Sequence, residues 1–101
     1  MSAQIPVNDR QIANFCRKHH ILKLALFGSV LRDDFRPDSD IDILVEFEPG
    51  HAPGFIGLYQ IEEELSSLLG GHRTDLVTRG FLNRRIRDQI LSEAEIHYAK
   101  G

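Results

Sequence analysis

The stretch Leu26-Phe27-Gly28-Ser29-Val30-Leu31-Arg32, followed by Ser39-Asp40-Ile41-Asp42-Ile43-Leu44-Val45, decides the fold. Its first half predicts a strand that ends at a Gly-Ser turn and opens into a short helix over residues 29–34. Its second half predicts a strand over residues 40–47. Residues two apart on a strand share a face, so the carboxylates of Asp40 and Asp42 are expected to point into one volume. The side chains expected to point the other way, into a core, are Ile41, Ile43 and Val45.

Two acids on one face of a strand are poor packing but suit a hard cation such as Mg²⁺, which binds one or two carboxylates plus substrate phosphates. The Gly-Ser turn supplies the complementary half. Gly28 lets a ligand approach the backbone closely, and Ser29 stands where free N–H groups at a helix start favour a phosphate. Arg32 follows one turn later as a donor fork for phosphate. Together these residues predict a site for a nucleoside triphosphate with Mg²⁺.

The composition places these motifs in one small domain, residues 1–101, with a net charge of −3. The charge gives no general reason to expect nucleic acid as a ligand. A single cysteine, Cys16, excludes an internal disulfide and a cysteine zinc cluster. The start of the chain shows no signal peptide, and no apolar run reaches the ~20 residues of a membrane span. We therefore expect a cytoplasmic protein that does not bind membranes.

Helical and strand patterns alternate along the rest of the chain, which favours an α/β fold. Asn8 is expected to cap a first helix with a buried stripe of Ile12, Phe15 and Cys16. Gly70-Gly71 is expected to end a second helix that carries Leu58, Ile61, Leu65 and Leu68. The predicted helices cover residues 9–20, 57–69 and 82–93, the further strands cover 21–27, 72–78 and 96–99, and a loop covers 48–54. The last helix carries an arginine cluster, Arg84, Arg85 and Arg87, which is either a solvated face or a docking surface.

Asp75 is a third acid in a setting like that of Asp42, a lone carboxylate in a short apolar strand. If the two strands are neighbours, Asp75 can join the aspartate pair. Three acids can hold two Mg²⁺ ions ~3.5–4 Å apart, the arrangement used for in-line attack at phosphorus. The alternative for Asp75 is an ion pair with Arg73 or with a neighbour in the sheet.

Gly28-Ser29, Arg32, Ser39-Asp40-Ile41-Asp42 and the later Asp75 together resemble the minimal nucleotidyltransferase (MNT) family of the DNA polymerase β-like nucleotidyltransferase superfamily. The resemblance covers nearly the whole chain. It implies a small mixed β-sheet flanked by helices, like the polymerase palm. One departure is Asp33, which stands where the family commonly has a glycine after the arginine.

The resemblance also implies roles for individual residues. Asp40, Asp42 and Asp75 would be the catalytic and metal-binding residues, with two Mg²⁺ ions and ATP as the substrate. Asp75 would complete the catalytic metal site and help to activate the nucleophile. The nucleotide-binding residues would be Gly28, Ser29, Arg32 and Ser39.

Many MNT proteins are encoded beside a small HEPN-domain toxin and act as its antitoxin, in characterised cases by transferring AMP from ATP to a tyrosine of the toxin. The resemblance therefore implies a protein adenylyltransferase with a HEPN toxin as its partner. Two alternatives stay open at this point. The chain is a non-catalytic antitoxin that neutralises by binding, or it is a nucleotidyltransferase that acts on RNA or a small molecule.

Overall fold

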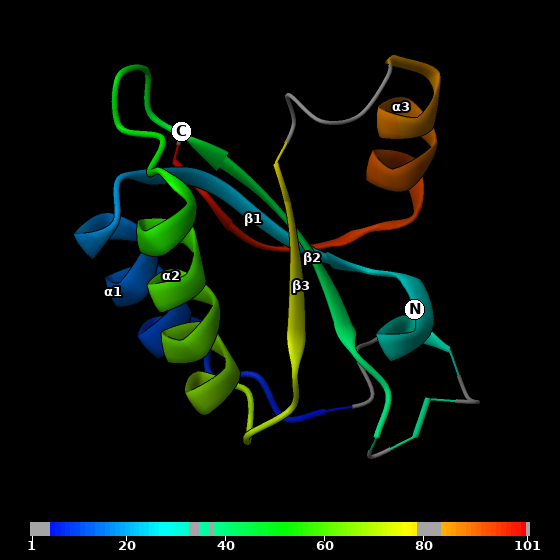
Figure 1. Cartoon of the computed structure of the whole chain (residues 1–101). Helices are drawn as coiled ribbons and strands as arrows, with labels where there is room; N and C mark the ends of the chain where they lie inside the picture. Colours follow the sequence, from blue (N-terminus) through cyan, green and yellow to red (C-terminus); the bar gives the residue numbers. More distant parts are fainter. Residues whose placement is uncertain (1–4, 33–34, 37, 79–83, 101) are drawn as a thin grey trace.

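The computed structural model describes residues 5–32, 35–36, 38–78 and 84–100, with the backbone alone for Arg84, Ile86 and Arg87. Helices and strands alternate along these residues (Figure 1), which confirms the predicted α/β class. The elements are α1 (Asp9–Lys18), β1 (Ile21–Phe27), the 3₁₀ helix η1 (Gly28–Leu31), β2 (Ile41–Phe47), α2 (Phe55–Leu68), β3 (Thr74–Thr78), α3 (Arg84–Glu93) and β4 (Glu95–Ala99).

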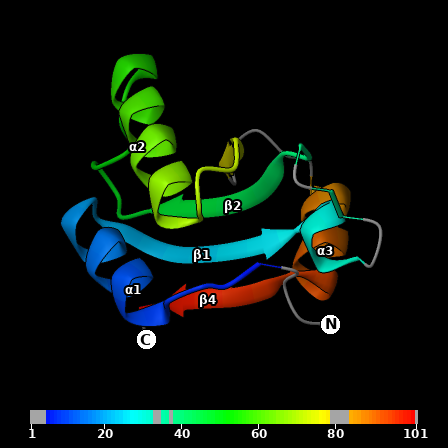
Figure 2. The same cartoon turned by 90° about the horizontal axis from the view of Figure 1, so that it is seen from below.

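The four strands form one mixed sheet in the order β3-β2-β1-β4. β1 is antiparallel to both β2 and β4, and β2 is parallel to β3. Figure 2 shows β2, β1 and β4 side by side in this order. α1 and α2 lie on one side of the sheet and α3 lies on the other (Figure 1). The chain leaves β1 through η1 and returns as β2, so the Gly-Ser turn and the aspartate pair meet at one end of the sheet.

The core lies between the sheet and the pair α1 and α2. Ile41, Ile43 and Val45 are fully buried there, as predicted, and pack with Ile12, Phe15, Ile61 and Leu65 from the two helices. Leu44 is on the opposite face of β2, the face of Asp42, and is also fully buried. Its partner across the sheet is Ala25, which is equally inaccessible. The prediction of one apolar face was therefore incomplete, because the middle of this sheet is buried on both faces.

Most element bounds agree with the predicted ones, and the differences have local causes. α1 ends at Lys18 because His20 takes a left-handed conformation, with φ of 57°, that turns the chain into β1. The short helix after Gly28 is a 3₁₀ turn that ends at Leu31, because Arg32 returns to an extended conformation. α2 begins at Phe55, two residues before the predicted start, and β3 begins at Thr74. Leu82, the predicted start of the last helix, lies outside the described residues.

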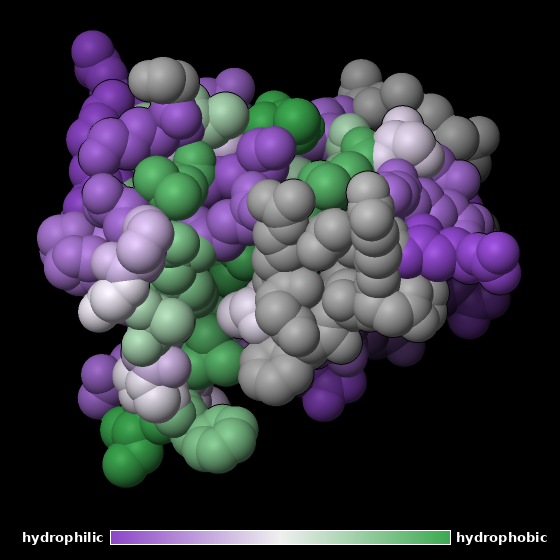
Figure 3. Space-filling view, turned by 90° about the horizontal axis from the view of Figure 1, so that it is seen from above, coloured by the Kyte–Doolittle hydropathy of each residue, from purple (hydrophilic) through white to green (hydrophobic). Residues whose placement is uncertain are grey.

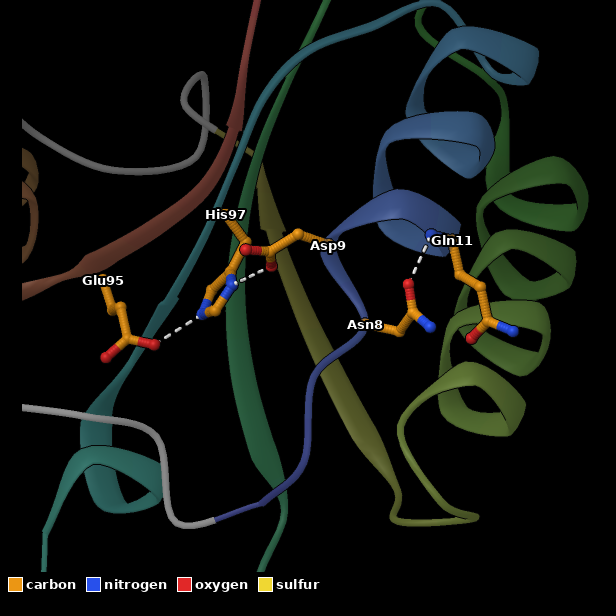
Figure 4. Close-up of polar contacts among 5 residues, drawn as sticks. All are labelled: Asn8, Asp9, Gln11, Glu95 and His97. Atoms are coloured by element: carbon orange, nitrogen blue, oxygen red, sulfur yellow. Dashed lines mark hydrogen bonds and ion pairs between the residues drawn. The ribbon is translucent and has the colours of Figure 1, made fainter.

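The start of α1 is fixed to the edge strand β4 (Figure 4). The Asn8 side chain accepts a hydrogen bond from the Gln11 backbone N–H at 3.1 Å, which is the predicted N-cap. His97 of β4 lies between two carboxylates, with Nδ1 2.7 Å from Asp9 and Nε2 2.6 Å from Glu95. The two ring nitrogens of His97 thus connect Asp9 of α1 with Glu95 of β4. This contact joins the two ends of the chain.

None of the helices in the described ranges combines the length and the apolar character that a membrane span requires.

Candidate active site

Asp42 and Asp75 are neighbours in the sheet. β2 and β3 are paired in parallel with Asp42 opposite Asp75, so both side chains lie on the same face. Asp42 is half-buried and Asp75 is exposed. The condition set for Asp75, that its strand should be next to the aspartate strand, is therefore met.

Gly28 lies directly against Asp42. Its φ of +78° is in the left-handed region that favours glycine, and a Cβ built at this position would be 2.3 Å from Asp42 Oδ2. No other residue fits there without moving the carboxylate. The Gly-Ser turn and the aspartate strand therefore form one site, with the backbone of η1 in contact with the carboxylate.

Asp40 lies just before β2, and Arg73 lies just before β3. The backbone N–H of Ile41 donates to the Arg73 carbonyl at 2.8 Å, which holds the two segments together. Arg73 Nε is 3.3 Å from Asp40 Oδ1, and both side chains are more than half exposed. Arg73 thus contacts Asp40 and not Asp75, the partner considered for it from the sequence. Across the described ranges, no three His, Cys, Asp or Glu side chains are grouped closely enough to hold a metal ion.

The electrostatics of the site are dominated by negative charge. The pKa of Asp42 is raised, first by burial and then by the charges of Asp75 and Asp40, while Arg32 opposes the rise. Carboxylate oxygens are the donors that Mg²⁺ prefers, and a cation would relieve this repulsion. The donor set therefore fits Mg²⁺ in its chemistry, although Asp40 is turned toward Arg73 in this structure.

The predicted phosphate-binding residues lie in η1 and in the turn before β2, the two segments that lead into the aspartate strand. Ser29 is half-buried within η1, and Arg32 is exposed at its end. Arg32 and Gly28 line a cavity of about 480 Å³ between η1 and the end of α3. The Ser39 hydroxyl accepts from the Arg36 N–H at 3.2 Å, and the Ser39 N–H donates to the Arg36 carbonyl at 2.9 Å, so Ser39 closes the turn that delivers Asp40.

Two residues near the acids were missed from the sequence, Arg73 as the partner of Asp40 and Glu62 of α2. The pKa of Glu62 is raised by burial and by Asp75, which places its carboxylate near the site. The Arg73–Asp40 pair could have been inferred by aligning Asp75 with Asp42 in parallel register, because residue 73 then faces residue 40. Asp33 and the side chains of Arg84 and Arg87 lie outside the described residues, while Arg85 is exposed.

A mixed sheet with paired aspartates beside a Gly-Ser turn defines the class of nucleotidyltransferases. The nucleotidyltransferase domain family model matches residues 9–97, and this chain belongs to that family. A candidate protein adenylyltransferase of Methanocaldococcus jannaschii is 35% identical over 85 residues, which cover 84% of this chain and 88% of the relative. The protein adenylyltransferase MntA of Thermococcus cleftensis is 38% identical over 73 residues, 72% of this chain and 71% of the relative.

Solved structures show the same fold. One of a candidate minimal nucleotidyltransferase matches with a TM-score of 0.72 and 36% identity, covering 86% of each chain. A toxin–antitoxin structure with AMP-PNP matches with a TM-score of 0.72 at 22% identity, covering 93% of this chain and 75% of the other. An MNT antitoxin in complex with a tri-AMPylated Shewanella oneidensis HEPN toxin matches with a TM-score of 0.64 at 21% identity, covering 91% and 70%. At these lower identities the likeness concerns the fold.

Proposed function

We propose that this chain is a Mg²⁺-dependent protein adenylyltransferase that transfers AMP from ATP to a tyrosine hydroxyl of a HEPN toxin and so acts as its antitoxin. The observation that carries the proposal is the in-register pair Asp42 and Asp75 with Gly28 in contact with the Asp42 carboxylate. The relatives named protein adenylyltransferase and the fold shared with an antitoxin beside an AMPylated toxin support the choice of substrate and partner.

In the proposed reaction the acceptor oxygen loses its proton and bonds to the α-phosphorus of ATP. The bond from this phosphorus to the pyrophosphate oxygen breaks, so the products are the AMP ester, pyrophosphate and a proton. Asp40, Asp42 and Asp75 would hold the Mg²⁺. When bound, Mg²⁺ offsets triphosphate charge and lowers the pKa of the attacking hydroxyl.

The chain's own residues position the substrate. Gly28 presents backbone without a side chain, so the triphosphate can approach the turn. Arg32 is the residue proposed to donate to a phosphate, and its guanidinium already acts on Asp42 electrostatically. Ser39 holds the turn before Asp40 through its two contacts with Arg36. Ser29 is proposed to contact the triphosphate from η1.

The proposal is tested by intact-mass spectrometry of the protein encoded by the adjacent gene, after incubation with the chain, ATP and Mg²⁺. We expect one or more additions of AMP. Asp42→Asn is expected to lower the transfer rate at least ~10³-fold, since it removes a metal ligand and nearby charge. Asp9→Asn is the matched control, because Asp9 lies on α1 and contacts His97 instead.

The alternatives give different results. If the wild type adds no AMP and Asp42→Asn still neutralises the toxin in cells, the chain acts by binding alone. If AMP appears on RNA or on a small molecule but not on the protein, the acceptor assigned here is wrong.

A further inference from the structure

The start of α2 exposes three large apolar side chains. Phe55 is 89% exposed, Ile56 78% and Tyr59 61%. Figure 3 looks onto the end of the molecule where α2 begins and shows a band of hydrophobic surface there, with hydrophilic side chains beside it. We call Phe55, Ile56 and Tyr59 the α2 patch. Contiguous exposed apolar surface of this kind marks an interaction site in soluble proteins.

The fold itself does not use the α2 patch. Ile61 and Leu65 supply the buried stripe of α2, and Leu58 packs against the core from the same side. Ile56 and Tyr59, three residues apart, share the opposite side of the helix, and Phe55 stands at the edge of the buried stripe, beside Leu58. Gly54 provides no side-chain cap and no acid stands in the first turn. The helix therefore begins with two exposed apolar residues where a capped, polar start is usual.

An apolar cavity of about 610 Å³ adjoins the patch. Phe55 and Leu58 line it on the side of α2, together with Pro53 of the preceding loop and the strand residues Leu22 and Phe47. A side chain from a partner that entered this cavity would be removed from water on several sides. Burial of one such apolar side chain is worth ~1.5–3 kcal/mol.

The patch continues into an acidic groove that leads toward the catalytic edge. Tyr59, Glu62 and Glu63 line a groove of about 390 Å³ with Arg73 and Thr74. The Thr74 hydroxyl donates to the Glu62 carbonyl at 3.2 Å, so this part of α2 is attached to β3 one residue before Asp75. At the other end of the groove Arg73 contacts Asp40. The groove thus connects the α2 patch with the aspartates.

We propose that the α2 patch and its cavity dock the acceptor protein through an amphipathic segment whose apolar side chains cover Phe55 and Ile56 and whose Lys or Arg side chains face Glu62 and Glu63. The inference rests on the proposed function, since it names the surface by which the acceptor is held. Aromatic residues next to a pocket are typical centres of binding energy in protein interfaces. The acidic groove selects a basic neighbour and guides the segment toward the aspartates.

A second copy of this chain does not fit the same surface. A two-fold symmetric contact pairs the α2 patch of one copy with that of the other, so the acidic residues beside both patches would enter the same interface. With Glu62 and Glu63 next to the patch and a net charge of −3, that contact brings like charges together. A partner with basic side chains makes the complementary contact.

The experiment measures the affinity of the protein encoded by the adjacent gene for three variants, by isothermal titration calorimetry in Mg²⁺ without ATP. Phe55→Ser with Ile56→Ser is expected to weaken binding at least tenfold. Ile96→Ser is the matched control, because Ile96 is 51% exposed but lies on β4, away from the α2 patch; we expect less than a twofold change. Glu63→Gln is expected to weaken binding severalfold at low salt and to make it less sensitive to salt. Circular dichroism checks that each variant folds.

Equal affinity of the double variant and the wild type would overturn the docking proposal while leaving AMP transfer intact. Binding that depends on the α2 patch without any AMP transfer would support the docking surface and contradict the proposed function. No binding by the wild type would overturn the docking proposal. Sedimentation velocity tests whether a second copy of this chain occupies the α2 patch. A wild-type dimer that becomes monomeric on Phe55→Ser with Ile56→Ser would assign the patch to a second copy and overturn the docking proposal.

Discussion

The carboxylates of this protein lie in two contrasting environments. At the edge formed by β2 and β3, the pKa values of Asp42 and Glu62 are raised by burial and by neighbouring acids. On the side of α1 and β4, carboxylates face cations. The pKa of Glu64 is lowered by hydrogen bonds from Lys18 and His19, and that of Glu48 is lowered by Lys100 and His20.

The carboxylates that face cations stabilise the fold, whereas the carboxylates that face other acids belong to the candidate site. Glu64 joins α1 to α2 through Lys18 at 2.7 Å and His19 at 3.0 Å, so its charge favours the folded state. Asp42 gains no comparable partner, since its neighbours Asp75 and Asp40 repel it. Groups placed against their own electrostatic preference are typical of functional sites. The site therefore costs the fold some stability, which the paired acids elsewhere help to offset.

After the loss of Asp42 itself, the largest effect is expected from breaking the site at Gly28. In Gly28→Ala the new Cβ collides with the Asp42 carboxylate, and the φ of +78° is strained for alanine. We expect AMP transfer to fall about 100-fold, since small misplacements of a catalytic group cost this much. We also expect a loss of about 1–3 kcal/mol in the free energy of unfolding. Transfer assays and urea denaturation measure the two.

Gly50→Ala is the control for backbone strain. Gly50 has a nearly identical φ of +80°, but nothing lies within 4 Å of a Cβ at that position. Its loss of stability should be about 1 kcal/mol, and AMP transfer should not change. If both variants lose activity equally, contact with Asp42 is not the reason that position 28 requires glycine.

The sequence predicts the strand that carries Asp42 well, because its geometry follows from a simple periodicity. Alternation in β2 places Ile41, Ile43 and Val45 in the core. Asp75 resembles Asp42 in its setting, and the condition that their strands be neighbours is met by the parallel pairing of β2 and β3. The helix cap at Asn8 and the strand over residues 21–27 follow in the same way from local chemistry.

Other features depend on contacts that a one-dimensional pattern does not contain. Helix α2 begins at Phe55, earlier than predicted. The prediction missed this start because Phe55 and Ile56 are exposed and do not belong to the buried stripe whose periodicity indicates the helix. Leu44 is buried on the acidic face because the sheet has cover on both sides there. The Arg73–Asp40 contact requires the parallel register of β2 and β3.

A smaller effect is expected from removing the cation that faces an acid at the site. Asp40 forms an ion pair with Arg73, and this arginine competes with a cation for the carboxylate. Arg73→Gln should bind Mn²⁺, a substitute for Mg²⁺, up to about fivefold more tightly, because exposed ion pairs are worth ~0.2–1 kcal/mol. Titration followed by the electron paramagnetic resonance of free Mn²⁺ measures this without any turnover.

Arg17→Gln is the matched control for the Arg73 experiment. It removes the same charge, but Arg17 is at the end of α1, where its side chain contacts Asn14. An equal gain in both variants would mean that net charge alone sets the affinity. Unchanged affinity in Arg73→Gln would remove Arg73 from any role at the metal site.

The smallest expected effects have opposite signs in the two environments. The folded-state pKa of Glu64 is below its ordinary value of 4.5, so its contribution is fully present above that pH and is lost as the pH falls through the folded-state pKa. Glu64→Gln should therefore lower the free energy of unfolding at pH 7 by roughly 0.2–1 kcal/mol. The difference from the wild type should vanish in acid.

Asp42 should respond in the other direction. Its folded-state pKa is above the ordinary value of 3.8, so the wild type loses stability as the pH rises from about that value through the folded-state pKa. Asp42→Asn removes this loss and should raise the free energy of unfolding at pH 7 by roughly 0.5–1 kcal/mol, as neutralising a strained functional site often does. Urea denaturation of both variants from pH 3 to pH 8 compares the signs. A less stable Asp42→Asn at neutral pH would show that cations outweigh the neighbouring acids at this carboxylate, and the contrast between the two regions would then be wrong.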